Sequence, residues 1–189
     1  MKKIIALLTA AALSTAAFAQ STWKVDKAHS RLTFTITHLA VSDVDGVFKD
    51  FNVTITAAKP DFSDAKFEMV AKTASVSTDD DKRDAHLKSG DFFDVATHPD
   101  MTFTSTGITP TSPNHYKLTG NLTLHGVTKP VTMDLWYRGT ITNMNKQDAG
   151  FQVTGSIKRS DFGFGSKYGS PMLSDEVTIK ANGEFAKAN

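Results

Sequence analysis

The segment LTGNLTLHGVTKPVTMDLWYR, residues 118–138, decides the fold class of this chain. Apolar or small residues alternate with polar ones on both sides of His125-Gly126, and a repeat of two is typical of a strand with one buried face. His125-Gly126 has the composition of a two-residue hairpin turn. The segment therefore predicts two antiparallel strands joined by a tight turn, with Pro130 at a strand edge or a bulge.

The same alternation recurs along most of the chain. Strands that follow one another with short antiparallel connections favour a sandwich or a barrel. The inward phase contains small residues, namely Ala71, Gly120, Gly155, Ala181 and Gly183, and these would leave room along a barrel axis. We therefore expect an all-β fold, an extended antiparallel β-barrel of about eight strands with a lined cavity. The expected strands are 22–25, 31–38, 44–57, 67–72, 101–104, 118–124, 131–138, 153–157 and 177–185.

Residues 78–103 interrupt this pattern. Thr78 is a candidate N-cap for one short α-helix near residues 79–89, whose first turn is acidic. Arg83, His86 and Leu87 are spaced i, i+3 and i+4, so they share one face of this helix. We expect the helix to plug one end of the barrel or to line its mouth.

A second irregular segment is the glycine-rich stretch DFGFGSKYGSPMLS, residues 161–174, which carries three aromatic residues. Loops of this length in compact domains tend to be functional or mobile.

The N-terminus and the composition limit the class of protein. Residues 1–19 have the features of a signal peptide, with Lys2 and Lys3 before an apolar run and an A-x-A site that predicts cleavage after Ala19. We expect one domain, residues 20–189, located in the periplasm. Without the two leading lysines, 19 of the 21 basic residues remain against 20 acidic ones. Such a neutral chain has no basic field for nucleic acid, and the absence of cysteine excludes thiol chemistry.

Catalytic and metal-binding signatures are missing from the sequence. It contains no H-E-x-x-H, no G-x-S-x-G and no phosphate-binding loop. Asp84 and His86, two residues apart on a helix, would point about 200° apart, which is poor geometry for a shared metal. We expect a protein that is not an enzyme and holds no metal or cofactor. If the protein is an enzyme after all, the alternative is a hydrolase or isomerase that acts at the barrel mouth, with Asp84, His86 and Ser30 as the nominal catalytic grouping.

Seven sequence blocks, taken in order, carry a family resemblance that spans nearly the whole mature chain. They are WKVDKAHS (23–30), FTITHL (34–39), GVFKDF (46–51), RDAHL (83–87) with DFFD (91–94), HPDMTF (98–103), GNLTLHGVTKPV (120–131) and KRSDFG (158–163). Together they resemble the YceI-like family of bacterial periplasmic, lipocalin-like polyisoprenoid-binding proteins. The resemblance implies an eight-stranded antiparallel barrel with a helix near one end, a long apolar tunnel for an isoprenoid or similar lipid chain, and no established catalytic activity.

For such a tunnel we expect apolar side chains of the inward phase as the lining. A strand of about ten residues tilted near 40° would give a tube on the order of 25 Å tall. Methionine suits a wall that adapts to its ligand. The alternative is that the same side chains fill a closed core, in a stress-related interaction module whose loops meet a partner. The expected lining residues are Phe34, Ile36, Phe48, Phe67, Met69, Met101, Phe103, Leu122, Leu124 and Met133.

Four polar residues are candidates for the mouth of the tunnel: His38, Arg83, His86 and Arg159. Arginine suits a diphosphate or a quinone oxygen, and histidine can donate a hydrogen bond. Each also has a structural alternative. Arg83 would pin the helix through an ion pair, Arg159 would pair with Asp161 or a helix carboxylate, and His38 would be a satisfied core histidine.

The function expected from these observations is binding, transport or storage of a long apolar isoprenoid-type lipid in the periplasm. A polyprenyl phosphate, an isoprenoid quinone and a fatty amide are the candidate ligands. We expect no nucleic-acid partner and no stable membrane insertion, and a homodimer through an open strand edge is a further hypothesis.

Overall fold

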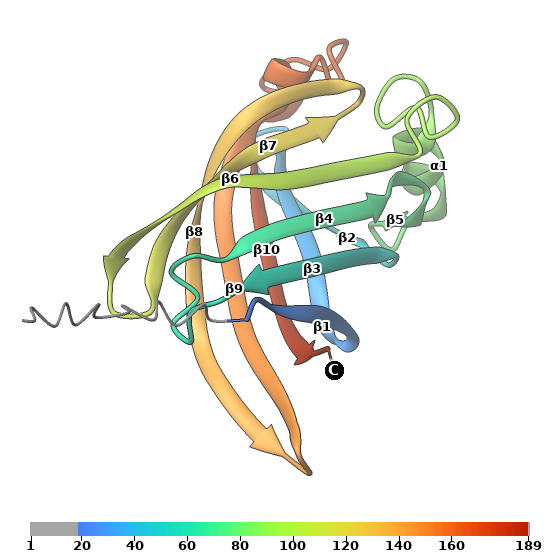
Figure 1. Ribbon diagram of the computed structural model, residues 1–189. Helices are drawn as coiled ribbons and strands as arrows, with labels where there is room; N and C mark the ends of the chain where they lie inside the picture. Colours follow the sequence, from blue (N-terminus) through green and yellow to red (C-terminus); the bar gives the residue numbers. More distant parts are fainter. Residues whose placement is uncertain (1–18, 189) are drawn as a thin grey trace, which may run out of the picture.

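The computed structural model describes residues 19–188, and Figure 1 shows that strands dominate this part of the chain. Residues 1–18, on which the signal-peptide prediction falls, lie outside the described residues. Among residues 19–188, none of the helices has the length and apolar character that a membrane span requires. The strands are β1 (Ser21–His38), β2 (Ser42–Phe48), β3 (Phe51–Ala57), β4 (Lys66–Lys72), β5 (Val76–Ser77), β6 (Asp100–Ser112), β7 (His115–Leu124), β8 (Val127–Asn143), β9 (Lys146–Lys158) and β10 (Leu173–Lys187). The helices are α1 (Asp81–Lys88) and two short 3₁₀ helices, η1 (Thr73–Ser75) and η2 (Arg159–Phe162).

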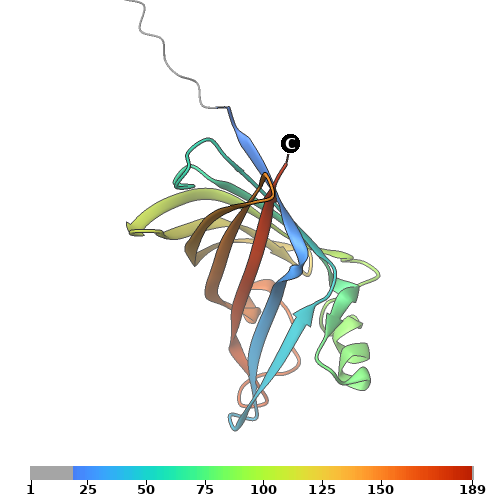
Figure 2. The same cartoon turned by 90° about the horizontal axis from the view of Figure 1, so that it is seen from below.

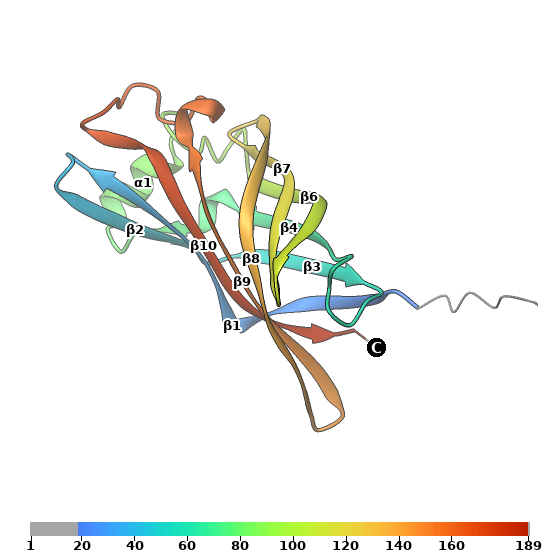
Figure 3. The same ribbon diagram turned by 90° about the vertical axis from the view of Figure 1, so that its left-hand side faces the viewer.

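Eight of these strands form a closed antiparallel barrel in the order β1-β3-β4-β6-β7-β8-β9-β10, with β10 paired to β1. The pairing of β1 and β10 is visible in Figures 2 and 3, where the two strands run side by side. The prediction of an eight-stranded antiparallel barrel with one short α-helix is therefore confirmed.

Strand β1 is long because it serves two neighbours along the same edge. Its first residues, Ser21–Lys24, pair with β3, whereas Leu32–His38 pair with β2. Strand β5 adds to the free side of β2, so β2 and β5 extend the sheet beyond the closed barrel. Helix α1 packs against β5 and therefore lies beside this extension.

The hairpin predicted from residues 118–138 is confirmed as β7 and β8. His125 and Gly126 have φ values of 51° and 74°, as a turn matched to the twist of the strands requires. Pro130 pairs opposite Asn121 of β7, and β8 begins to pair with β9 only at Asp134. Pro130 therefore lies on an edge, where its missing N–H leaves no gap in a ladder.

The β3–β4 connection lies at the end of the barrel opposite α1 (Figure 1). An aromatic cluster fills the barrel at this end. Its centre is Phe62, from the β3–β4 connection, whose ring lies 5.3 Å from that of Trp23 and 4.9 Å from those of Tyr137 and Phe151. Phe62 is 2% exposed. A second buried cluster, which includes Leu32, Phe48, Phe93, Met101, Leu122, Leu124 and Phe162, lies toward α1. The interior of the barrel is therefore filled by packed side chains at the end opposite α1.

Two of the small inward residues do not leave axial space, which corrects the sequence-based argument. A Cβ atom at Gly120 would lie 2.5 Å from Cε2 of Phe103 and 2.7 Å from the carbonyl oxygen of Thr104. A Cβ atom at Gly155 would meet the sulfur of Met133. Large neighbours thus cover these glycines, as aromatic side chains do over glycine in other sheets.

The helix begins later than expected and has a different cap. Asp80, not Thr78, is the N-cap, because its carboxylate accepts a hydrogen bond of 2.9 Å from the Arg83 N–H. Thr78 instead donates to Asp84 Oδ1 from its backbone N–H (2.7 Å) and its hydroxyl (2.6 Å). Asp84 is a buried carboxyl; burial raises its pKa, but these hydrogen bonds outweigh burial and hold it below its usual value. Thr78 and Asp84 thus anchor α1 to β5.

Candidate functional site

An apolar cavity of about 340 Å³ lies between the extended part of the sheet, α1 and the loop of residues 163–172. Strands β1, β2, β9 and β10 form one wall, α1 and the segment after it form another, and the loop forms the third. The apolar lining residues are Leu32, Phe34, Ile36, Val44, Phe48, Leu87, Phe92, Phe93, Met101, Leu124, Ile157, Phe164, Met172, Leu173, Val177 and Ile179.

Strand register explains why this wall is apolar. Phe34 of β1 stands opposite Gly46 of β2 and Ile179 of β10, and Ile36 stands opposite Val44 and Val177. Directly opposed residues of neighbouring strands share one face of the sheet, so these side chains gather on the inner side. The ring of Phe34 lies over Gly46, where a Cβ atom would clash with it.

Of the ten predicted tunnel residues, five line this cavity: Phe34, Ile36, Phe48, Met101 and Leu124. That they contact a ligand stays a prediction. The prediction that Phe67, Met69, Phe103, Leu122 and Met133 belong to the same wall is wrong, because none of them lines the cavity.

Packing explains each of these five corrections. Phe67 belongs to the aromatic cluster, with its ring 5.7 Å from Phe151. Phe103 and Met133 cover glycines. Leu122 is buried in the second cluster and Met69 packs against it. The hollow part of the interior is therefore one end of the barrel, shorter than the expected tube of about 25 Å.

All four predicted mouth residues, His38, Arg83, His86 and Arg159, lie on the cavity wall. The shared helix face of Arg83, His86 and Leu87 is confirmed, since the three side chains line the cavity together. His38 is half-buried at the end of β1, opposite Leu173.

Arg159 holds the loop rather than a carboxylate. Its side chain is buried, and its five N–H groups all donate to backbone carbonyls of the segment that follows it. Nε donates to Ser174 (2.9 Å), Nη1 to Phe164 (3.1 Å) and Gly165 (2.8 Å), and Nη2 to Leu173 (3.2 Å) and Tyr168. The expected ion pair with Asp161 or a helix carboxylate is wrong, because these bonds use every donor of the guanidinium.

Arg83 also has a structural task, but it retains donors. Its Nε donates to the Thr78 hydroxyl and its Nη2 to the Thr78 carbonyl, both at 2.7 Å. The expected ion pair that would pin the helix is replaced by these two bonds. They use two of the five N–H groups of Arg83, which is exposed and lies at the cavity wall.

A polar contact, which we call the Asp91 latch, ties the loop to the segment after α1. The Asp91 carboxylate accepts hydrogen bonds from Lys167 Nζ (2.6 Å) and the Tyr168 hydroxyl (3.3 Å), and lies 3.3 Å from His86 Nε2. The Tyr168 ring stacks on Phe92 at 5.2 Å. The bond from Lys167, and then that from His86, holds the pKa of Asp91 below its usual value, while the same bond raises the pKa of Lys167. The latch therefore holds the loop against the segment after α1, where both line the cavity.

The loop residues at the cavity were absent from the predicted site. Phe164, Tyr168 and Met172 come from an irregular segment, in which no alternation says which side chains face inward. Only the length of the loop and its aromatic content pointed to it. Val177 and Ile179, by contrast, lie on the predicted inward phase of β10 and could have been chosen by the same rule as Phe34.

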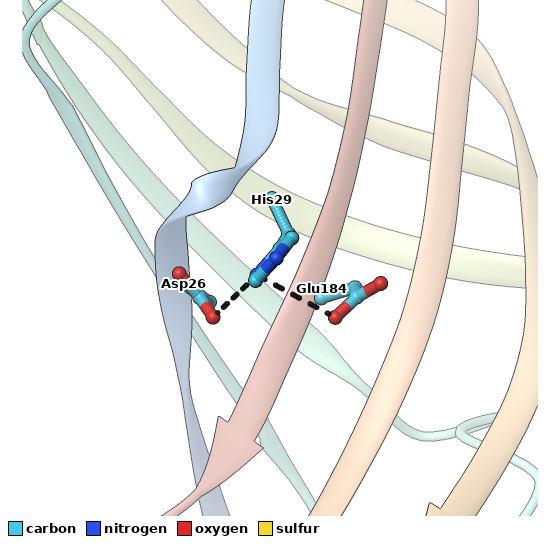
Figure 4. Close-up of side chains that lie close together, drawn as sticks. All are labelled: Asp26, His29 and Glu184. Atoms are coloured by element: carbon cyan, nitrogen blue, oxygen red, sulfur yellow. Dashed lines mark hydrogen bonds and ion pairs between the residues drawn. The ribbon is translucent and has the colours of Figure 1, made fainter.

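A separate cluster of Asp26, His29 and Glu184 lies at the outer side of the β1 bulge (Figure 4). His29 Nδ1 is 2.9 Å from Asp26 Oδ2 and 4.0 Å from Glu184 Oε2. The bond to Asp26, and then the nearby Glu184, raises the pKa of His29. Ser30 donates to the Glu184 carbonyl at 3.4 Å. The His29–Asp26 bond holds the bulge of β1 together, and the Ser30 bond ties the bulge to β10.

The grouping Asp84, His86 and Ser30 does not form a catalytic set. Asp84 binds Thr78, His86 faces the Asp91 latch, and Ser30 binds β10. A nucleophile, base and orienting residue have to lie within hydrogen-bond reach of one another.

Comparison with known proteins gives consistent results. A family model described as the YceI-like domain matches residues 23–185. Protein YceI of Salmonella newport (strain SL254) is 37% identical over 188 residues, which is 97% of this chain and 98% of that protein. The crystal structure of a Campylobacter jejuni YCEI protein matches with a TM-score of 0.75 at 35% identity, covering 82% of this chain and 91% of that one.

Two further solved structures share the barrel. Burkholderia cenocepacia BcnA matches with a TM-score of 0.74 at 28% identity, covering 85% of this chain and 98% of its own. A polyisoprenoid binding domain from Saccharophagus degradans matches with a TM-score of 0.64 at 17% identity, covering 89% of this chain and 98% of that one, which shows a shared fold. The family match over residues 23–185 decides the assignment, and this chain belongs to the YceI-like family.

Proposed function

We propose that this protein binds the isoprene units next to the head group of a long isoprenoid-type molecule in the cavity, and carries or stores that molecule in the periplasm. The observation that supports the proposal is a cavity of about 340 Å³ walled almost wholly by aliphatic and aromatic side chains. A few polar groups stand at one side of it, as is common in sites for small molecules. The Saccharophagus degradans domain is named for polyisoprenoid binding; at 17% identity it supports the fold alone.

The cavity volume limits how much of a chain enters. An apolar cavity of about 150 Å³ holds one benzene, so a cavity of this size takes roughly 14 carbon atoms, or about three isoprene units. At about 0.8 kcal/mol for each buried CH₂, the gross gain is about 11 kcal/mol before the cost of association. A farnesyl-length segment therefore fills the cavity, and the rest of a longer chain has to stay outside.

The head group belongs at the exposed side of the mouth. Arg159 has no donor left for a ligand, whereas Arg83 is exposed and keeps three N–H groups. Arg83 is therefore the group that would meet a phosphate or a quinone oxygen. The bound molecule would be a polyprenyl phosphate, an isoprenoid quinone or a fatty amide.

A titration with a dansyl-labelled farnesyl probe tests the proposal. In Val177→Phe the larger side chain occupies the cavity, so we expect the affinity to fall at least tenfold. Val70→Phe is the matched control, since Val70 is 40% exposed on the outer side of β4 and should leave the affinity unchanged. Far-UV circular dichroism and thermal unfolding check that both variants fold. Equal affinity of wild type and Val177→Phe, with both folded, contradicts binding in this cavity.

Native purification gives an independent test. Organic extraction of the folded protein, followed by mass spectrometry, should release an isoprenoid or a similar long-chain lipid in wild type and much less of it in Val177→Phe. A wild-type protein that yields no lipid and binds no probe would favour the interaction-module hypothesis, which the filled aromatic end of the barrel already fits in part.

A further inference from the structure

Three large apolar side chains are exposed together beside the cavity. Leu39 is 50% exposed, Val41 83% and Met172 47%. Leu39 and Val41 belong to the turn between β1 and β2, and Met172 immediately precedes β10. The Leu39 N–H donates to the Met172 carbonyl at 3.0 Å, which joins the two segments. Figures 2 and 3 both show these two tips side by side at one end of the molecule. We call the three residues the apolar rim.

Turn geometry gives no reason for apolar residues in this place. Leu39 and Ala40 have φ values of 52° and 57°, a left-handed conformation that favours glycine and asparagine. The β7–β8 turn uses Gly126 in the same region of φ. Half of the Leu39 surface stays exposed in an unfavourable backbone conformation, and with Val41 and Met172 it forms a patch rather than a scattered apolar residue, so the patch needs another explanation.

The rim is continuous with the cavity. Met172 lines the cavity and is also exposed at the rim, and His38, next to Leu39, lines the cavity from the other strand. An apolar chain that leaves the cavity on this side therefore passes directly over the rim.

We propose that the apolar rim inserts into the surface of a lipid bilayer, so that an isoprenoid chain moves between bilayer and cavity without crossing water. This inference rests on the proposed function. A bilayer fits the rim because it is the apolar phase in which such a chain dissolves, and exposed apolar side chains at a tip bind at its interface.

The charges near the rim indicate what kind of bilayer surface suits it. Asp43 and Asp45 of β2 accept hydrogen bonds from the hydroxyls of Thr37 (2.8 Å) and Thr35 (2.5 Å), and Lys167 is held by Asp91. Nothing in this arrangement favours anionic lipid, which is recognised by clustered unpaired basic residues. The contact is apolar and should depend little on salt.

Flotation of the mature chain with phosphatidylcholine vesicles tests the rim. We expect the partition coefficient of the double variant Leu39→Ser/Val41→Ser between vesicles and water to be at least tenfold lower than that of wild type. The decrease should be the same at 0.05 and 0.5 M salt. The matched control is Ile141→Ser/Met144→Ser at the β8–β9 hairpin, where the side chains are 66% and 90% exposed. The control should bind vesicles like wild type.

Three outcomes overturn the inference: wild type that binds no vesicles, a rim variant that binds like wild type, or a control that loses as much as the rim variant. Binding that requires anionic lipid and vanishes in high salt also overturns it, since the contact would then be electrostatic.

A second measurement separates this inference from the proposed function. The rim variant should bind the dansyl-farnesyl probe in solution with wild-type affinity, yet take it from vesicles at least fivefold more slowly. Equal transfer rates contradict the role of the rim while leaving cavity binding intact. A wild-type protein that does not bind the probe in solution contradicts the proposed function, and flotation still decides whether the rim meets a bilayer.

Discussion

Arg159→Met should destabilise the protein strongly, because Arg159 donates to five backbone carbonyls of residues 164–174. Of these, the Gly165 carbonyl also accepts from the Tyr168 N–H and keeps that donor in the variant. Methionine keeps the length and apolar stem of the side chain but removes all five hydrogen bonds. Each carbonyl left without a donor costs about 1 kcal/mol where water reaches it and more where it does not. Relief from burying the guanidinium offsets part of this cost, so we expect a net loss of about 3–5 kcal/mol.

The assay is urea unfolding, combined with hydrogen exchange of residues 163–173. Arg159→Lys keeps the charge but has three donors and no fork, so we expect a loss between those of wild type and Arg159→Met. Lys158→Met, at an exposed neighbouring position, is the control and should change stability by less than about 0.5 kcal/mol. Amides of the loop should exchange faster in Arg159→Met.

If the unfolding free energy of Arg159→Met lies within about 1 kcal/mol of wild type, this reasoning is refuted. Breaking a buried hydrogen-bond network should cost more than that. If such a stable variant had also lost affinity only for ligands with an anionic head, Arg159 would be a ligand-binding residue after all.

Three other predictions follow from the same structure. Asp91→Asn should speed dissociation of the farnesyl probe several-fold in stopped-flow measurements. Because the pKa of Asp91 is lowered, the latch of wild type should hold above pH about 4 and break as the pH falls through that pKa. Probe dissociation from the variant should not become faster over the same acidic range. Gly120→Ala should lower the unfolding free energy by about 1–3 kcal/mol because its Cβ meets Phe103, while Gly90→Ala, with open space around it, should be within about 1 kcal/mol of wild type. Extending a prenyl alcohol from 10 to 15 carbons should raise the affinity about tenfold or more, whereas extension from 15 to 20 should add little, because the cavity is full at roughly 14 carbons; a steady rise to 20 in calorimetry would show a longer channel.

Much of the barrel follows from the sequence because alternation with period two is a local property. It identified β7, β8 and β10, and it found both parts of β1 but as two strands, 22–25 and 31–38. The spacing of Arg83, His86 and Leu87 gave the helix face that lines the cavity. Alternation says which side chains point inward, but not how far along the axis they lie. It therefore could not separate Phe34, at the cavity, from Phe67, in the aromatic cluster.

The other differences have their cause in contacts that leave no sequence pattern. Phe62 fills the far end of the barrel from within a loop, where no alternation marks it as inward. The partners of Arg159 are backbone carbonyls, which every residue carries, so a sequence offers only Asp161 as a visible partner. Threonine and aspartate are both favoured N-cap residues, so the sequence does not choose between Thr78 and Asp80. In the structure Thr78 donates its hydroxyl to Asp84, and the Asp80 carboxylate accepts from the Arg83 N–H as the cap.

The seam between β1 and β10 has a consequence for how the chain acquires its fold. The two strands pair residues as far apart as Trp23 and Lys187, so the first described strand waits for the last before the ring is complete. Contacts this distant in sequence form slowly, and until they form both strands present unpaired edges to other chains. A nascent polypeptide that lacks β10 should therefore be prone to aggregate, and the barrel should close only once β10 has been synthesised.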